Sequence, residues 1–154
     1  MLFVCSGNIS RSYLAEALFQ QALQDREQGN VEVRSAGLFA FPGNSPDEEM
    51  ARFLLERGGT PGNHRARLLG SEDVVWADLI LAMEHGHTLS ISQRFPEAQD
   101  KTHLLGRFIP GVDRPEEIPD PFGLSSAHYR HVQTRIVLAV EGLLKEVLQG
   151  DLKG

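Results

Sequence analysis

The stretch "LFVCSGNISRS", residues 2–12, decides the fold that we expect for this chain of 154 residues. Its apolar start, residues 2–4, has the character of a short buried strand. From residue 12 to about residue 28, apolar side chains recur at spacings of three and four, which predicts an amphipathic helix. A strand that passes through a loop into a helix is typical of a parallel α/β sheet.

The same alternation of strand and helix continues along the chain. Further strands are predicted at residues 31–35, 78–83 and 102–105, and helices from a capping Ser45, after Ser71, and over 84–93 and 126–148. We therefore expect an α/β fold, namely a three-layer sandwich whose four-stranded parallel sheet carries helices on both faces. Residues 1–150 are expected to form a single domain, and residues 151–154 a short polar tail.

Composition and charge narrow the class of function. The net charge of -6 argues against general affinity for nucleic acid or for anionic membranes, and no apolar run approaches the roughly 18 residues of a membrane span. The first residues lead directly into the cysteine, without the pattern of a signal peptide. A single cysteine excludes an internal disulfide. We therefore expect a cytoplasmic protein with a free thiol.

Residues 5–11 occupy the carboxyl end of the first strand, where parallel sheets bind their ligands. Backbone N–H groups in such a loop, together with the amino terminus of the following helix, attract anions. Gly7 and Asn8 suit the tight turns of such a loop, and Arg11 can hold two oxygens of a phosphoryl group at once. The sequence thus predicts a phosphate-binding loop after the first strand.

The single cysteine, Cys5, lies at the start of this loop. Positive surroundings favour its thiolate form, which is a nucleophile, and the Ser12 hydroxyl can donate a hydrogen bond to the sulfur. The alternative is a buried structural thiol beside a surface arginine. The spacing of Cys5, Gly7, Asn8, Arg11 and Ser12 favours the catalytic interpretation.

The segment "VCSGNISRS" resembles the signature loop of the low-molecular-weight protein tyrosine phosphatases, Cys-x-Gly-Asn-x-x-Arg-Ser. The segments "VRSAG", "NSPD", "HRAR", "ADLILAM" and "IPDPFG" resemble further family segments in the same order. This resemblance implies that Cys5 is the nucleophile, Arg11 the phosphate-binding arginine and Asp120 the general acid. The residues implied to bind phosphate or support the loop are Ser6, Gly7, Asn8, Ile9, Ser10, Ser12, Ser35 and His64.

An acid is also required by the chemistry, because transfer of a phosphoryl group to sulfur leaves an oxyanion behind. A positioned acid that protonates it contributes roughly 10²–10⁴-fold. Asp120 precedes Pro121 in a Pro- and Gly-rich stretch with the character of a long ordered loop. The alternative for one aspartate among 21 acidic residues is a solvated surface group.

The resemblance implies phosphotyrosine as the substrate, and its ring would lie in a crevice formed by Ile9, Phe41 and Phe122. The resemblance also places Phe39 in the walls of this crevice, but the interpretation that we favour for Phe39 is loop packing. The protein arginine phosphatases are the alternative on the same fold, because several share a phenylalanine at the position of Phe122. They characteristically have threonine at the position of Ile9, so that Ile9 favours tyrosine.

Other functions fit less well. Ser10 replaces a second cysteine found in many relatives, which excludes an internal disulfide relay and ranks an arsenate reductase low. A non-catalytic phosphate-binding module is disfavoured because Cys5 and Asp120 are both present. The segment "EHGH", residues 84–87, is a weak metal candidate. We expect no metal or organic cofactor, a phosphorylated protein as substrate with a bacterial-type tyrosine kinase as one candidate, and a monomer or weak dimer.

Overall fold

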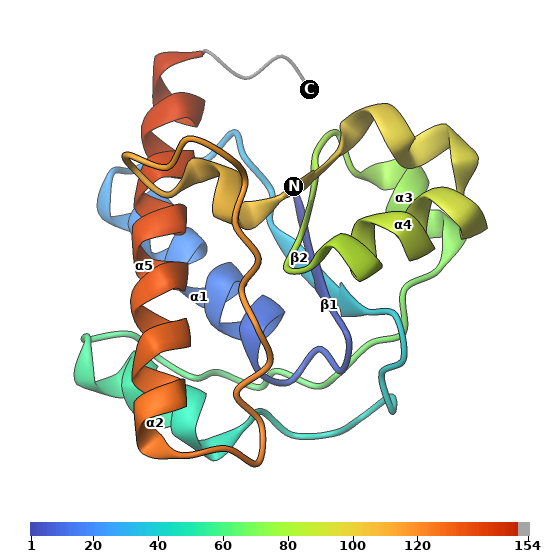
Figure 1. Cartoon of the computed structure of the whole chain (residues 1–154). Helices are drawn as coiled ribbons and strands as arrows, with labels where there is room; N and C mark the ends of the chain where they lie inside the picture. The colour runs from blue at the N-terminus through green and yellow to red at the C-terminus, as the bar shows by residue number, and fades with distance from the viewer. Residues whose placement is uncertain (151–154) are drawn as a thin grey trace.

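A four-stranded parallel sheet forms the middle layer of the computed structural model, which describes residues 1–150 (Figure 1). The predicted polar tail, 151–154, lies outside the described residues. The strand order is β2-β1-β3-β4. The strands are β1 (Leu2–Cys5), β2 (Arg34–Gly37), β3 (Ile80–Ala82) and β4 (Thr102–Leu104).

Helices cover both faces of this sheet, so that the predicted three-layer α/β architecture is confirmed. In Figure 1, α1 and α5 lie on one side of the sheet and α3 and α4 on the other, while α2 packs against α1 and α5. The α-helices are α1 (Arg11–Asp25), α2 (Glu48–Glu56), α3 (Ser71–Trp76), α4 (His85–Arg94) and α5 (Ser126–Gln149). Two 3₁₀ helices, η1 (Pro96–Lys101) and η2 (Leu105–Phe108), were not predicted.

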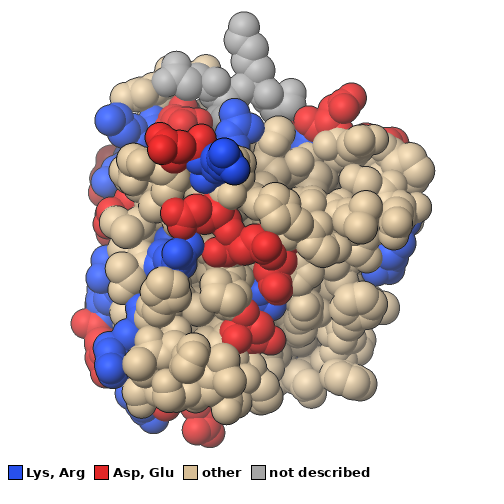
Figure 2. All heavy atoms as spheres, viewed as in Figure 1, with Lys and Arg blue, Asp and Glu red and all other residues tan. Residues whose placement is uncertain are grey.

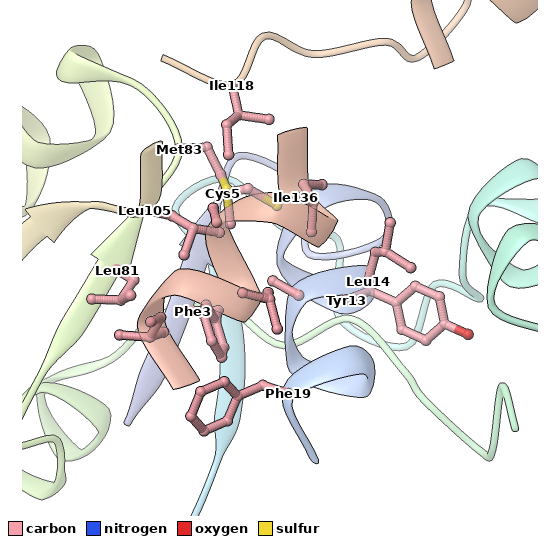
Figure 3. Packing of buried hydrophobic residues seen from close by; sticks show 14 of the residues in the cluster. Phe3, Cys5, Tyr13, Leu14, Phe19, Leu81, Met83, Leu105, Ile118 and Ile136 are labelled. Atoms are coloured by element: carbon pink, nitrogen blue, oxygen red, sulfur yellow. The ribbon is translucent and has the colours of Figure 1, made fainter. Parts of the chain in front are cut away.

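The central position of β1 in the sheet explains why its sequence is apolar without alternation. Phe3 and Cys5 point into the core beneath α1 and α5, whereas Leu2 and Val4 point into the core beneath α3 and α4. All four residues are buried, because both faces of the strand are covered. Figure 3 shows Cys5 beside Met83 and Ile118 in the first of these cores.

The second strand begins later than predicted. The prediction placed it over 31–35, but β2 starts at Arg34 and ends at Gly37. Its register explains the shift, because Arg34 pairs with Leu2 and residues 31–33 lie beyond the start of β1. Strand length is thus set by the partner strand and not by the apolar residues of the segment alone.

Two helix boundaries also differ from the prediction. Asp47, and not Ser45, caps α2, because its side chain accepts a hydrogen bond from the backbone N–H of Glu49 at 3.0 Å. The first helix ends at Asp25 instead of residue 28. In neither case does the change move a predicted site residue out of its loop.

The strand order positions the functional region. After β1, the chain forms β2 on one side of β1 and then β3 on the other. Ligands of such sheets bind where the order reverses, at the carboxyl ends of the strands. The loop after Cys5 and the turn at Glu84, which follows β3, meet at this edge. Within residues 1–150, no helix is both long and apolar enough to cross a membrane.

Candidate active site

Asn8 is the centre of the phosphate loop formed by residues 5–11. It is fully buried and has a left-handed backbone with φ of 56°. Its Oδ1 accepts a hydrogen bond from the backbone N–H of Arg67 at 2.9 Å. Because a backbone N–H can only donate, this bond fixes the amide orientation, and Nδ2 donates to Ser12 Oγ and Ser35 Oγ, each at 2.9 Å. The buried amide therefore connects three separate segments.

Further polar groups behind this amide hold it in place. Ser35 Oγ donates onward to Glu16 Oε1 at 2.6 Å, and His64 Nε2 donates to the carbonyl oxygen of Asn8 at 2.6 Å. A network in which each member is satisfied is rigid, since rotation of any one group would leave a buried polar atom unpaired. The predicted supporting residues Asn8, Ser12, Ser35 and His64 are thus brought together.

The sulfur of Cys5 ends this hydrogen-bond chain. Cys5 is only 2% exposed, and its Sγ lies 3.0 Å from Ser12 Oγ. Because Ser12 Oγ already accepts from Asn8, its own hydrogen is free to point toward the sulfur. A hydroxyl that donates to sulfur stabilises the thiolate, in the manner expected from the sequence.

Gly37 permits the close approach of β2 to the loop. A Cβ at this position would lie 2.7 Å from the carbonyl oxygen of Ser6 and 2.9 Å from the backbone nitrogen of Asn8. Real Cβ contacts are essentially never shorter than 3.0 Å, and these two partners are backbone atoms. Any other residue would therefore displace the phosphate loop.

Arg11 is buried and held from one side. Its Nη1 donates to Glu84 Oε2 at 2.6 Å and to the carbonyl oxygen of Ile118 at 2.8 Å. Its Nε has no hydrogen-bond partner among residues 1–150, and neither does the buried Oγ of Ser10. Nε is thus unpaired within the described residues, and Nη2 lies within ion-pair distance of Asp120 at 3.9 Å. These two nitrogens form the edge with which a guanidinium holds two oxygens of a phosphoryl group.

Asp120 faces the same guanidinium from a different part of the chain. Its Oδ2 lies 3.9 Å from Arg11 Nη2, and its Oδ1 accepts from the backbone N–H of Phe122 at 3.0 Å. The segment is anchored by Ile118, which is fully buried and donates its N–H to the carbonyl oxygen of Met83 at 2.8 Å. The side chain of Asp120 remains 51% exposed and open to substrate and water.

One crevice brings the three predicted catalytic residues together. It has a volume of about 200 Å³ and is lined by Cys5, Ser6, Gly7, Ile9, Ser10, Arg11, Phe39, Phe41, Asn44, Asp120 and Phe122. Its three phenylalanines are exposed, Phe39 at 68%, Phe41 at 76% and Phe122 at 61%. The interpretation of Phe39 as loop packing is wrong, because this ring is exposed and forms part of the crevice. Asn44 was not predicted there.

Two polar residues after β3 complete the site and were not predicted in it. Glu84 pairs with Arg11, and His87 Nε2 lies 2.9 Å from Ser6 Oγ. Burial, and secondarily the charge of Arg11, lowers the pKa of His87 below its ordinary value. The position of Glu84 at the end of a strand beside β1 is the signal that sequence reasoning could have used. No group of three potential metal ligands occurs in the described part of the chain.

Acidic side chains gather along the segment between η2 and α5, which carries Asp120 (Figure 2). Glu116 pairs with Arg135 at 2.6 Å, and the carboxylate of Glu117 accepts from the backbone N–H of His85 at 3.3 Å. These contacts hold the segment against α5 and α4. They therefore help to place Asp120 over the loop.

The sequence is similar to those of known proteins over nearly its whole length. The family model for low molecular weight phosphotyrosine protein phosphatases matches residues 1–152. A protein-arginine-phosphatase of Geobacillus stearothermophilus is 38% identical over 96% of this chain and 95% of its own length. The low molecular weight protein-tyrosine-phosphatase Etp of Escherichia coli (strain K12) is 34% identical over 86% and 83% of the two chains.

Solved structures give the same result. The crystal structure of the Erwinia amylovora tyrosine phosphatase AmsI superposes with a TM-score of 0.83 and 32% sequence identity, over 94% of this chain and 89% of that one. Sequence and three-dimensional structure thus agree over nearly the whole chain. The chain belongs to the low molecular weight phosphotyrosine protein phosphatase family.

Proposed function

We propose that this protein hydrolyses phosphotyrosine in proteins through a phosphocysteine intermediate. The observation that supports this most strongly is the single crevice that holds the Cys5 sulfur, the Nε and Nη2 edge of Arg11 and the Asp120 carboxyl. These groups are a nucleophile, a clamp for phosphoryl oxygens and an acid, which are the three parts that such a transfer requires.

In the first step, the Cys5 thiolate attacks phosphorus while Arg11 and the backbone N–H groups of the loop bind the phosphoryl oxygens. The bond from phosphorus to the tyrosine oxygen breaks, and the protonated carboxyl of Asp120 gives its proton to that oxygen. The hydrogen bond from Ser12 stabilises the thiolate before attack. The products are the free tyrosine side chain and a phosphate bonded to Cys5.

In the second step, the carboxylate of Asp120 takes a proton from a water molecule as the water oxygen attacks phosphorus. The bond from phosphorus to sulfur breaks, which releases inorganic phosphate and restores the Cys5 thiolate. The Ser12 hydroxyl again stabilises the leaving sulfur. The exposed position of Asp120 supports this role, because water reaches it freely.

The walls of the crevice support an aromatic substrate. A flat ring would lie between the exposed rings of Phe39, Phe41 and Phe122, where offset or edge contacts add about 0.5–1.5 kcal/mol each. Ile9 also lines the crevice and presents an apolar surface with no hydroxyl. Both features favour phosphotyrosine over a polar phosphoamino acid.

Phosphoarginine is the second candidate substrate. The relatives from Geobacillus stearothermophilus and Bacillus subtilis (strain 168), 38% and 35% identical, are both named protein-arginine-phosphatases. A guanidinium also stacks on aromatic rings. Position 9 is the feature that best distinguishes the two candidates. Ile9 has no hydroxyl that could contact a polar substrate such as phosphoarginine.

We further propose that a bacterial-type tyrosine kinase is among the protein substrates, and that the protein acts in the cytoplasm as a monomer or weak dimer. The exposure of all three phenylalanine walls supports a protein substrate, because a phosphorylated loop can reach them from outside. Sedimentation of the purified protein across a range of concentrations tests the oligomeric state.

The decisive experiment compares hydrolysis of a phosphotyrosine peptide and a phosphoarginine peptide of otherwise equal sequence. The variants Ile9→Thr, which adds a hydroxyl, and Ile9→Val, which keeps the wall apolar, form a matched pair. We expect phosphotyrosine to be hydrolysed much faster, and Ile9→Thr, but not Ile9→Val, to reduce this preference.

The control is Cys5→Ser, which should abolish hydrolysis of both peptides. Faster hydrolysis of phosphoarginine by the parent protein would overturn the tyrosine assignment in favour of the second candidate. Hydrolysis that survives in Cys5→Ser would overturn the phosphocysteine mechanism.

A further inference from the structure

His87 contacts the phosphate loop from outside and takes no part in the chemistry described above. It lies in the first turn of α4, is only 5% exposed, and its Nε2 lies 2.9 Å from Ser6 Oγ. Ser6 directly follows Cys5 and lines the crevice. The two residues are 81 positions apart in the sequence, and the pairing of β1 with β3 brings their loops together.

The other ring nitrogen fixes which atom of His87 carries the proton. Nδ1 lies 3.1 Å from the backbone N–H of Glu84, which donates to it. Because Nδ1 accepts this bond, the neutral ring must carry its hydrogen on Nε2. Nε2–H then donates to Ser6 Oγ, and the Ser6 hydroxyl hydrogen must point away from the ring. The imidazole thus holds Ser6 in one orientation.

His87 also borders the group that holds Arg11. Its Nε2 lies 3.6 Å from Glu84 Oε2, the same oxygen that accepts from Arg11 Nη1 at 2.6 Å. The imidazole therefore contacts Ser6 at the start of the phosphate loop and lies beside Glu84, which pairs with Arg11 at the end of the loop.

We propose that His87 is a positioning residue, whose Nε2–H bond to Ser6 fixes the start of the phosphate loop in the shape that receives a phosphoryl group. The effect of His87 on kinetics rests on the proposed function. Its effect on the binding of inorganic phosphate does not depend on turnover.

The charged groups around the ring predict how pH affects this contact. Burial and Arg11 disfavour a second proton on His87, whereas Glu84, Asp120 and Glu117 favour it, and the sum lowers the pKa. A proton on Nδ1 would also face the N–H of Glu84 and break that bond. We therefore expect the neutral ring, and the bond that Nδ1 accepts from Glu84, to persist below the ordinary histidine value of about 6.5. The Nε2–H group can donate to Ser6 in either protonation state.

The lowered pKa of His87 makes the free energy of unfolding depend on pH in a defined direction. The unfolded chain binds the proton more readily than the folded chain, so that the free energy of unfolding falls as pH drops below about 6.5 toward the lowered folded value. At higher pH the neutral ring makes its full contribution to the free energy of unfolding. Replacing His87 with a side chain that does not titrate removes this part of the pH dependence.

Two substitutions separate the two hydrogen bonds of the ring. In His87→Gln, the amide nitrogen is as many bonds from Cβ as Nε2 is, so that it can still donate to Ser6. In His87→Asn, the amide oxygen replaces Nδ1 as the acceptor for Glu84, but no donor reaches Ser6. The same two substitutions at His85 are the matched controls, because its side chain is exposed and its bond to Glu117 comes from the backbone N–H, which both substitutions keep.

We expect His87→Asn to lower kcat/KM and the affinity for inorganic phosphate about three- to tenfold, as for the loss of one positioning hydrogen bond. His87→Gln should retain most of both, and the variants of His85 should leave both unchanged. In a Ser6→Ala background, His87→Asn should cause little further loss, because the two residues act through one bond.

Nitrogen NMR of the parent protein tests the geometry directly, because it reports which ring nitrogen of His87 carries the proton. A proton on Nδ1, or equal losses in His87→Gln and His87→Asn, would overturn the inference. Absence of phosphatase activity in the parent protein would instead contradict the proposed function, and the phosphate affinities of the variants would still decide the role of His87.

Discussion

The phosphate loop and the aromatic walls meet in one crevice, but they are built on different physical principles. In the loop, Asn8 and Arg11 are almost completely buried and each makes several hydrogen bonds to distant segments. In the walls, Phe39, Phe41 and Phe122 expose more than half of their side chains.

This difference separates the chemistry from the choice of substrate. A buried network tolerates little change, because every altered member leaves a polar group unpaired. Exposed rings on loops can be replaced without disturbing the fold. We therefore expect changes in the loop to affect every substrate and also stability, whereas changes in the walls alter the preference among substrates. Asp120 belongs to both regions, since it faces Arg11 from an exposed segment.

The largest effect is expected at Asp120, where the comparison predicts a catalytic loss without a loss of stability. Asp120→Asn keeps the shape of the side chain but has no proton to donate, so that kcat should fall by roughly 10²–10⁴-fold. Steady-state kinetics with a series of aryl phosphates is the measurement, and the decrease should be greatest for the poorest leaving groups.

Thermal unfolding is the control for this variant, whose melting temperature should stay close to that of the parent protein. Unchanged turnover of a poor leaving group by Asp120→Asn would contradict the role of Asp120 as the acid. A lower melting temperature would show that the segment is less independent of the fold than its exposure indicates.

A smaller effect, on both activity and stability, is expected at Asn8. Asn8→Gly retains the left-handed backbone and removes the amide, whereas Asn8→Ala also strains the backbone at φ of 56°. Loss of the amide leaves the N–H of Arg67 without its acceptor. We expect Asn8→Gly to lower the free energy of unfolding by about 1–3 kcal/mol, and Asn8→Ala by roughly 1–2 kcal/mol more.

Chemical denaturation measures both values, and activity toward any aryl phosphate should fall together with stability. Equal stability of the two variants would show that the backbone strain at this position is small. Full stability in both would contradict the view that the buried network holds the loop.

The sequence was sufficient to predict where the loop of residues 5–11 lies, because its signal is local. Cys5, Asn8 and Arg11 lie within seven residues, and the apolar strand and the helix around them fix where the loop must be. The alternation of strands and helices likewise predicted the three layers correctly. Local patterns thus carry the fold class and the position of the loop.

Contacts between distant segments could not be predicted in the same way. Glu84 meets Arg11 across 73 positions and His87 meets Ser6 across 81 positions, and both depend on which strand lies beside β1. The clearance that requires Gly37 depends on how closely β2 approaches the loop. Such features follow from strand order, which periodicity alone does not specify.

The exposure of a loop residue is equally hidden from the sequence. A phenylalanine in a Pro- and Gly-rich loop is more often packed than exposed, and this expectation failed for Phe39. The start of β2 at Arg34 was missed because the register of β1, and not local propensity, sets it. In both cases the tertiary structure overrides a local preference.

The smallest effect is expected in the walls. Phe41→Ala removes one exposed ring and should raise KM for a phosphotyrosine peptide by about two- to tenfold, in keeping with about 0.5–1.5 kcal/mol per ring contact. It should leave kcat for a small phosphate ester nearly unchanged, and should change the free energy of unfolding by less than about 0.5 kcal/mol. Val75→Ala is the matched control, because Val75 is also 76% exposed but lies outside the crevice. The contrary outcome is that Phe41→Ala unfolds at a lower temperature than Val75→Ala, or lowers the rate of hydrolysis of all substrates equally. Either result would show that the walls take part in holding the loop. The separation between chemistry and substrate choice would then be less complete than the burial of the two regions indicates.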